Sequence, residues 1–159
     1  MRVLGAVLGL SLLVLQAGCE ENLGVDTNSA LEAVPAKTVM LFDPQHGFQI
    51  VFFETAQKSW LWYPGNRESL SADVRQDSKQ LCFKYRRNSN NPVTDKRGGG
   101  WSCLPRFLHE GLTVASEVGD VFNLAGGHAP YIRGKCDGTQ RFGRGTVDPG
   151  LYRQGCQGN

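Results

Sequence analysis

Two neighbouring runs decide the fold of this chain: TVMLF at residues 38–42 and FQIVFFE at residues 48–54. Both are rich in β-branched and aromatic side chains, which favour strands. The interval DPQHG at residues 43–47 holds the Pro and Gly that are typical of a turn. The stretch therefore predicts two successive β-strands joined by a tight connection.

Shorter strand-like runs follow, separated by Pro, Gly and Asn. They predict strands at 59–63, 67–74, 80–86 and 101–104, further strands at 114–118 and 121–124, and one helical turn within 107–115. This close spacing predicts a mainly β fold, an antiparallel meander that stays open or curls into a small open barrel. Beyond residue 134 the chain is rich in Gly and short of apolar residues, which predicts an irregular C-terminal segment tied by a disulfide.

The N-terminus has the pattern of a secretory signal. Arg2 precedes an apolar run from Val3 to Leu15, and the small pair Ala17-Gly18 follows. The run is shorter than the roughly 20 residues that a spanning helix needs. We therefore expect a signal peptide at 1–18, a flexible tether at 19–36, a β-rich domain at 37–134 and an irregular extension at 135–159. A buried N-terminal helix is the alternative.

The stretch LQAGC at residues 15–19 resembles the bacterial lipobox. The resemblance implies that Cys19 becomes the N-terminus and carries acyl chains such as palmitate, which hold the protein at a membrane surface of the cell envelope, facing the periplasm. Gln16 departs from the pattern, which has an apolar residue there. Ordinary leader cleavage, which would give a soluble periplasmic or secreted protein, stays open.

The cysteine count predicts two disulfides. If Cys19 is lipidated or removed, an even set of four remains in an exported protein. Three pairings are open, and we favour the two that each close a loop of about 20 residues, Cys82–Cys103 and Cys136–Cys156. A zinc site is the rival, but the chain has no C-x-x-C pair and its His residues lie at no ligand spacing. We expect no metal and no cofactor.

Net charge bears on the class of partner. Loss of Arg2 with the leader would leave 16 of the 17 basic residues against 15 acidic ones. Nucleic-acid binding needs a strong basic excess, so we expect no nucleic-acid partner.

Two groups of residues are candidates for binding. Trp60 and Trp62 share one face of a strand, where aromatic rings bind sugars or a partner protein, although a place in the core is the favoured alternative. The cations Lys84, Arg86 and Arg87 suit a phosphate or carboxylate group, and the alternative is a solvated sheet face whose charges discourage edge pairing.

Signatures of an enzyme are missing. The chain has no G-x-S-x-G, H-E-x-x-H or G-x-G-x-x-G, and Gly98-Gly99-Gly100 predicts a hairpin turn rather than a phosphate loop. An enzyme would require a deep pocket that holds two or more of His46, Glu54, Asp73, His109 and His128. We expect no catalytic activity.

Four motifs carry a family resemblance: LWYPGN at 61–66, LCFKY at 81–85, NPVT at 91–94 and GGWSC at 99–103. With them, the segment from Leu61 to Cys103, about 43 of the 159 residues, resembles small exported proteins of alphaproteobacteria. The resemblance implies an exported β-rich domain in which Cys82 and Cys103 belong together, and it implies no activity.

These observations predict a non-catalytic lipoprotein of the cell envelope whose β-rich domain binds a protein or an envelope component. One alternative is an inhibitor or accessory factor of an envelope hydrolase, which would act through a rigid loop at 88–100. The other is a small enzyme that acts on the cell wall.

Overall fold

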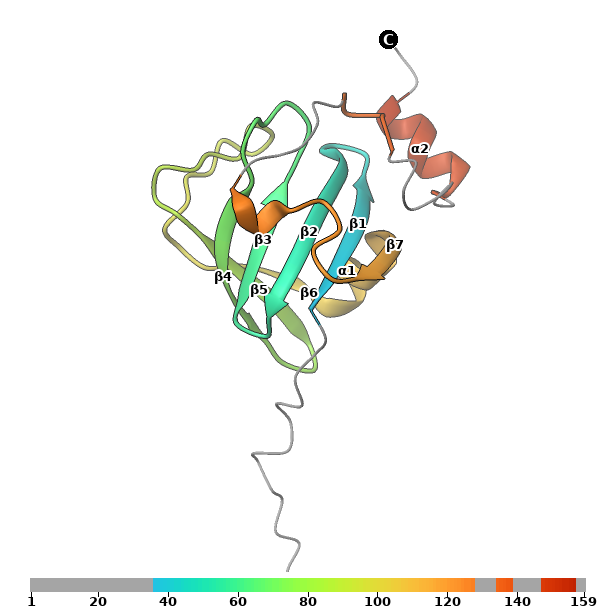
Figure 1. Ribbon diagram of the computed structural model, residues 1–159. Helices are drawn as coiled ribbons and strands as arrows, with labels where there is room; N and C mark the ends of the chain where they lie inside the picture. Colours follow the sequence, from blue (N-terminus) through green and yellow to red (C-terminus); the bar gives the residue numbers. More distant parts are fainter. Residues whose placement is uncertain (1–35, 128–133, 139–146, 157–159) are drawn as a thin grey trace, which may run out of the picture. The chain divides into compact units, whose positions relative to one another are not determined.

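The computed structural model describes residues 36–127, 134–138 and 147–156. In these ranges, seven antiparallel strands form one sheet that curls into a half-barrel (Figure 1). The strands are β1 (Lys37–Asp43), β2 (Gly47–Thr55), β3 (Lys58–Trp62), β4 (Leu70–Gln76), β5 (Gln80–Tyr85), β6 (Ser102–Pro105) and β7 (Thr113–Val118), in the order β6-β5-β4-β3-β2-β1-β7. The predicted fold class is confirmed. The predicted signal peptide and Cys19 lie outside the described residues.

Aspartate side chains shape two of the hairpins. Between β1 and β2, Asp43 Oδ1 accepts hydrogen bonds from the backbone N–H groups of Gln45 and His46, at 2.8 and 2.9 Å. Asp77 does the same between β4 and β5. Such short side chains offer the backbone a partner where the ladder ends, which stabilises the turn.

Successive side chains of β1 and β2 point to opposite faces of the sheet, and they are buried on both faces. Val39 and Leu41 pack on the inner face with residues from β2, β4 and β5. Met40 and Phe42 pack on the outer face with Ile50 and other residues. This period of two makes β1 and β2 the shared centre of two apolar cores.

The helix α1 (Arg106–Leu112) joins β6 to β7, which lie at opposite edges of the sheet. Seven flat strands would set these edges about 29 Å apart, whereas seven helical residues span about 10 Å. The sheet therefore has to curl. The helix contacts strands near both edges and packs Leu112 on the inner core, behind the sheet in Figure 1.

The segment after β7 covers the outer face of β2 and β3, where it runs across the front of the sheet in Figure 1. It contains the short helix η2 (Leu124–Gly126), and Leu124 is fully buried. The expected strand at 121–124 is wrong. Asp120 accepts hydrogen bonds from the N–H groups of Leu124 and Ala125, and this capping turns the backbone away from an extended form.

The C-terminal segment contains a helix where irregular structure was predicted. In α2 (Pro149–Cys156), Asp148 Oδ1 accepts hydrogen bonds from the N–H groups of Gly150 and Leu151, at 2.8 and 3.0 Å. An N-cap Asp followed by Pro is a helix-start signal, which low apolar content hid. Tyr152 anchors the helix by stacking on Phe42 at 5.7 Å between ring centroids.

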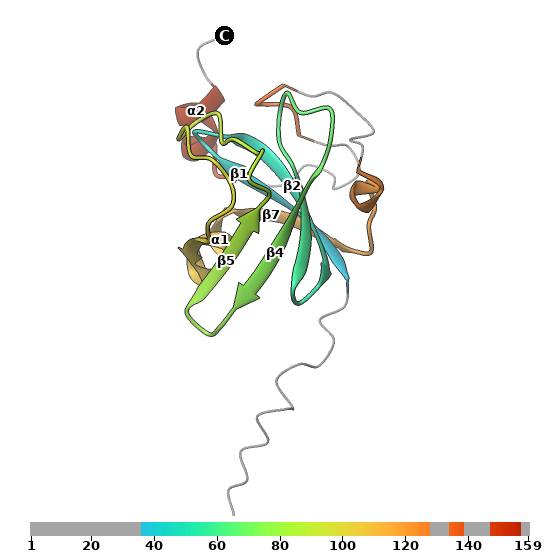
Figure 2. The same ribbon diagram turned by 90° about the vertical axis from the view of Figure 1, so that its left-hand side faces the viewer.

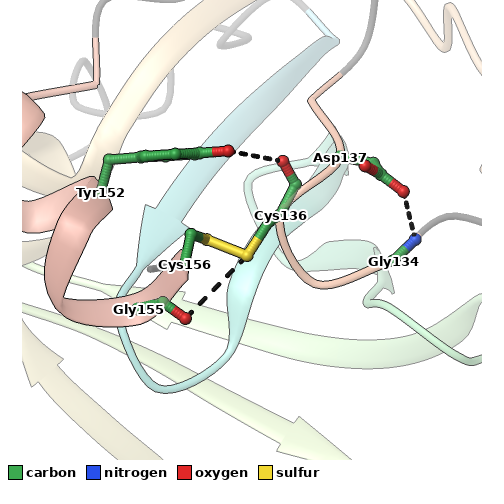
Figure 3. Close-up of a disulfide and its surroundings, with 6 residues drawn as sticks. All are labelled: Gly134, Cys136, Asp137, Tyr152, Gly155 and Cys156. Atoms are coloured by element: carbon green, nitrogen blue, oxygen red, sulfur yellow. Dashed lines mark hydrogen bonds between the residues drawn. A yellow bond between two sulfur atoms is a disulfide. The ribbon is translucent and has the colours of Figure 1, made fainter. Parts of the chain in front are cut away.

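Both favoured disulfides form. Cys82 and Cys103 are directly opposite in the register of β5 and β6. Cys136–Cys156 ties α2 to the preceding segment, where the Tyr152 hydroxyl also donates to the Cys136 carbonyl oxygen, at 3.4 Å (Figure 3). Two such bonds are typical of a protein that folds in an oxidising compartment, the envelope or the exterior of the cell. Within the described ranges, no helix has the length and hydropathy that a membrane span requires.

Candidate binding surface

Cations and two tryptophans gather on the outer face of β3, β4 and β5. Alternation places Lys58, Asp73 and Lys84 in one row across these strands, because Lys58 pairs with Asp73 and Asp73 with Lys84. We call the whole surface the basic face and define it by Lys58, Trp60, Arg75, Lys84, Arg86, Arg87 and Trp101.

Most of these cations lack an ionic partner. Lys58 Nζ lies 3.7 Å from the carboxylate of Glu54. Among the residues that the structure describes, Arg75, Lys84, Arg86 and Arg87 have no ion pair. Asp73 is the acidic member of the central row, so the basic face keeps a positive excess although the whole chain is near neutral.

Three of the five cations of the basic face lie against a tryptophan ring. The guanidinium carbon of Arg75 lies 4.4 Å from the ring centroid of Trp101, and Lys84 Nζ lies 5.9 Å from it. Lys58 Nζ is 5.0 Å from the ring of Trp60. Such cation–π contacts stabilise an exposed pair by about 0.5–1 kcal/mol and orient the charge without neutralising it.

Two grooves run along this face and join. The first, of about 440 Å³, is lined by Lys58, Ser71, Lys84, Arg86 and Arg87, among others. The second, of about 450 Å³, shares Ser71 and Arg86 and continues past Trp60 to Gly127. The structure thus brings together four of the five binding candidates from the sequence.

Comparisons with protein-family models, curated proteins and solved structures find no match. The function must therefore be inferred from the residues of this chain.

Trp62, the fifth candidate, is a core residue. Its side chain is 1% exposed and packs with Ile50 and Phe48, and its Nε1 donates to the carbonyl oxygen of Asn66 at 2.8 Å. Trp60 stays half-buried, and its Nε1–H donates a hydrogen bond to Glu54 Oε2, at 2.7 Å. The two tryptophans therefore differ in burial: Trp62 belongs to the outer core with Leu124 of η2, whereas Trp60 stays at the surface.

Three members of the basic face were not predicted as binding residues from the sequence: Lys58, Arg75 and Trp101. The signal that would have found Trp101 is its spacing, since it lies two residues before Cys103. The favoured Cys82–Cys103 pairing places Cys103 beside β5, and alternation then puts Trp101 on the same face as Lys84.

The described members of the suggested catalytic set are not brought into one pocket. His46 lines a cleft at one end of the sheet, Asp73 lines a groove of the basic face, and Glu54 binds Trp60. His128 lies outside the described residues. In the described part of the chain, no three potential ligands gather at a site that fits a metal ion.

His109 packs against the inner core instead. Its ring lies 5.7 Å from that of Phe53 and 6.3 Å from that of Phe83, between centroids. Burial lowers the pKa of His109 to about 4, and the positive charges of Lys37 and Arg106 act in the same direction, against Glu110. The side chain is therefore neutral at physiological pH, as its apolar surroundings require.

The loop at 88–100 is an ordered hairpin. Asn90 and Arg97 form a β-bridge, and Asn91 Oδ1 accepts hydrogen bonds from the N–H groups of Val93 and Thr94 at the turn. The three glycines follow on the returning arm. A Cβ at Gly98 would overlap the carbonyl oxygen of Arg86, so this close approach requires glycine.

Proposed function

We propose that this protein is a non-catalytic envelope lipoprotein that binds an acidic envelope component through the basic face. The main supporting observation is a set of cations that have no ion-pair partner among the described residues. Arg75 and Lys84 contact Trp101, and Lys84, Arg86 and Arg87 line joined grooves that continue past Trp60. Guanidinium groups bind carboxylates and phosphates with paired, charge-assisted hydrogen bonds. The tryptophans add flat apolar area beside these charges.

Export and anchoring complete the proposal. The two disulfides suit an oxidising compartment, and the lipobox-like stretch supports acylation of Cys19. Intact-mass measurement of protein extracted from membranes tests the anchor. We expect a chain that begins at Cys19 and carries acyl chains, and an unmodified Cys19 or a later start would contradict this part.

The binding surface is tested with charge-reversal variants. We expect the full chain to retain an acidic protein from envelope extracts at low salt and to lose it as salt is raised. The variant Lys84→Glu/Arg86→Glu/Arg87→Glu should lose most of this binding. The matched control Lys96→Glu/Arg97→Glu, which alters exposed cations off this face, should keep it.

Vesicles of phosphatidylglycerol provide the second arm of this test. Binding to these vesicles that depends on the same three cations, without retention of a protein, would identify the component as lipid phosphate. Equal binding by wild type and the triple variant in both arms would refute a role for the basic face.

The ordered loop favours inhibition of an envelope hydrolase as the second candidate. Its internal hydrogen bonds and the exposed Val93, 43% accessible, match the rigid protruding loop that such a role requires. We expect the wild type to slow hydrolysis of cell-wall substrate by envelope extracts and Val93→Asp to lose this effect. Equal inhibition by both proteins would contradict this candidate.

A further inference from the structure

The half-barrel is closed at one end and open at the other. At the closed end, α1 packs Leu112 on the inner core, and the Arg106 N–H donates to the Lys79 carbonyl oxygen at 2.8 Å. At the opposite end, the inner face continues beyond the core as a cleft of about 440 Å³. The mouth of a barrel is a common place for a small-molecule site, and this volume lies in the usual range.

The floor of the cleft is apolar and belongs to the inner face. Leu61 and Leu70 are directly paired between β3 and β4, and Tyr85 follows on the same face of β5. Leu61 and Tyr85 are only partly buried by the inner core. Part of their apolar surface is thus left for an occupant of the cleft.

The walls of the cleft are tied together. One wall is the β1–β2 turn and the end of β3, and the other is the hairpin at 88–100. His46 joins them, because its ring nitrogens lie 2.9 Å from Asp43 Oδ1 and 3.3 Å from Asn91 Oδ1. The Tyr63 hydroxyl donates to the Asn90 carbonyl oxygen at 3.3 Å. The cleft is thus preformed, which lowers the entropic cost of binding.

The charge of the rim selects the ligand. Lys96 and Arg97 line the cleft, and none of the described residues that line it is acidic. In the described part of the chain neither cation has an ion-pair partner. An apolar floor below an unopposed cationic rim is complementary to a molecule with an apolar body and one acidic group.

We propose that this cleft is a second binding site, which meets the basic face at Trp101 but contains none of its cations, and that it takes a small amphipathic anion. The apolar body lies on Leu61, Leu70 and Tyr85, and the acidic group meets Lys96 and Arg97.

Titration calorimetry of the full chain with naphthalene-2-sulfonate tests this site. We expect saturable binding that falls by about tenfold or more in Lys96→Glu/Arg97→Glu, because the acidic group then meets like charge. The control Lys84→Glu/Arg86→Glu should bind within about twofold of wild type, since these side chains belong to the basic face. Naphthalene-2-methanol, which has the same rings and no charge, should bind about tenfold more weakly.

Three outcomes would overturn the proposal: no saturable binding by the wild type, equal affinity in the Lys96/Arg97 variant, or equal affinity for the neutral alcohol. Melting curves of both variants serve as a check on folding, and all four substituted side chains lie on the surface or its edge. The basic-face proposal is tested separately, because its ligands are different and each set of substitutions is expected to impair binding at one site and to spare it at the other.

Discussion

At the scale of single residues, the environment of a side chain decides its chemistry. His109 and His46 show this contrast. His46 holds two loops together because its ring nitrogens lie within hydrogen-bond distance of Asp43 and Asn91. His109 instead lies among phenylalanine rings, and its buried Nε2 has no hydrogen-bond partner among the described residues. A buried imidazole in such surroundings resists protonation.

The first prediction concerns pH and His109. The unfolded chain takes up a proton at this side chain near pH 6.5, but the folded chain does so only near a pKa of about 4. Between these values the unfolded state binds more protons, so the free energy of unfolding falls as pH drops through this window. The free energy of unfolding falls by about 3 kcal/mol at most, because a difference of one pKa unit between the folded and unfolded states corresponds to about 1.36 kcal/mol. Urea unfolding at pH 7, 5.5 and 4.5 measures it.

The variant His109→Phe is the control, because it fills the same space and cannot titrate. Its stability should be nearly constant across this window. Asp43 and Asp77 do not affect this comparison. Against partial burial, hydrogen bonds from His46 and Gln45 lower the pKa of Asp43, and backbone hydrogen bonds from Lys79 and Gln80 lower the pKa of the exposed Asp77. The stability that these two carboxylates contribute is therefore lost only below about pH 4. A wild type equally stable at pH 7 and 4.5 would contradict this account.

At the scale of elements, the close approach of chain segments determines where glycine is needed. The hairpin at 88–100 lies against the end of β5, with the Gly98 N–H donating to the Ser89 carbonyl oxygen and that of Gly99 to the Tyr85 carbonyl oxygen. Gly98 is next to the backbone of Arg86, whereas a Cβ at Gly100 meets nothing within 4 Å. The two positions are thus a matched pair.

The second prediction compares these glycines. Gly98→Ala should lower the free energy of unfolding by about 1–3 kcal/mol, because the added methyl group forces the hairpin away from β5. Gly100→Ala should be neutral or stabilise by about 0.4–1 kcal/mol, since it only restricts the unfolded chain. Denaturant melts of both variants measure the difference. Equal effects at the two positions would show that the hairpin does not pack as described.

At the scale of the whole molecule, contacts distant in sequence decide which surfaces stay exposed. The hairpin of β4 and β5 extends from the sheet in Figure 2, and segments that follow β7 cover the outer faces of β1 and β2 and the end of β3 at Trp62. The basic face is what these covering segments leave open. The Cys136–Cys156 bond helps to hold one of them, α2, on the outer core.

The third prediction tests this covering segment. Replacement of Cys136 and Cys156 by Ser should cost about 3 kcal/mol of stability on the chain-entropy model, for a bond that closes about 20 residues. The packing of Tyr152 on Phe42 should loosen, and near-ultraviolet circular dichroism should report it. Because α2 lies off the basic face, binding through Lys84, Arg86 and Arg87 should persist. Loss of that binding in a folded variant would link the two regions.

The sequence by itself determined the local structure and the covalent frame. Runs of β-branched and aromatic residues between Pro, Gly and Asp mark the strands, because alternation and turn chemistry act over a few neighbouring residues. The cysteine count predicted two disulfides, and loop length favoured, among three possible pairings, the one that the structure has. The start signal of α2 at Asp148-Pro149 was also present, although the few apolar residues after it hid the helix.

Only the tertiary structure decided which of these residues act together. Trp60 and Trp62 have the same local pattern, and they differ because a segment about 60 residues further along the chain covers Trp62. Trp101 joins Arg75 and Lys84 through strand register, and the cleft exists because a short helix bridges the two edges of the sheet. Burial and long-range pairing depend on distant parts of the chain, which no local pattern encodes.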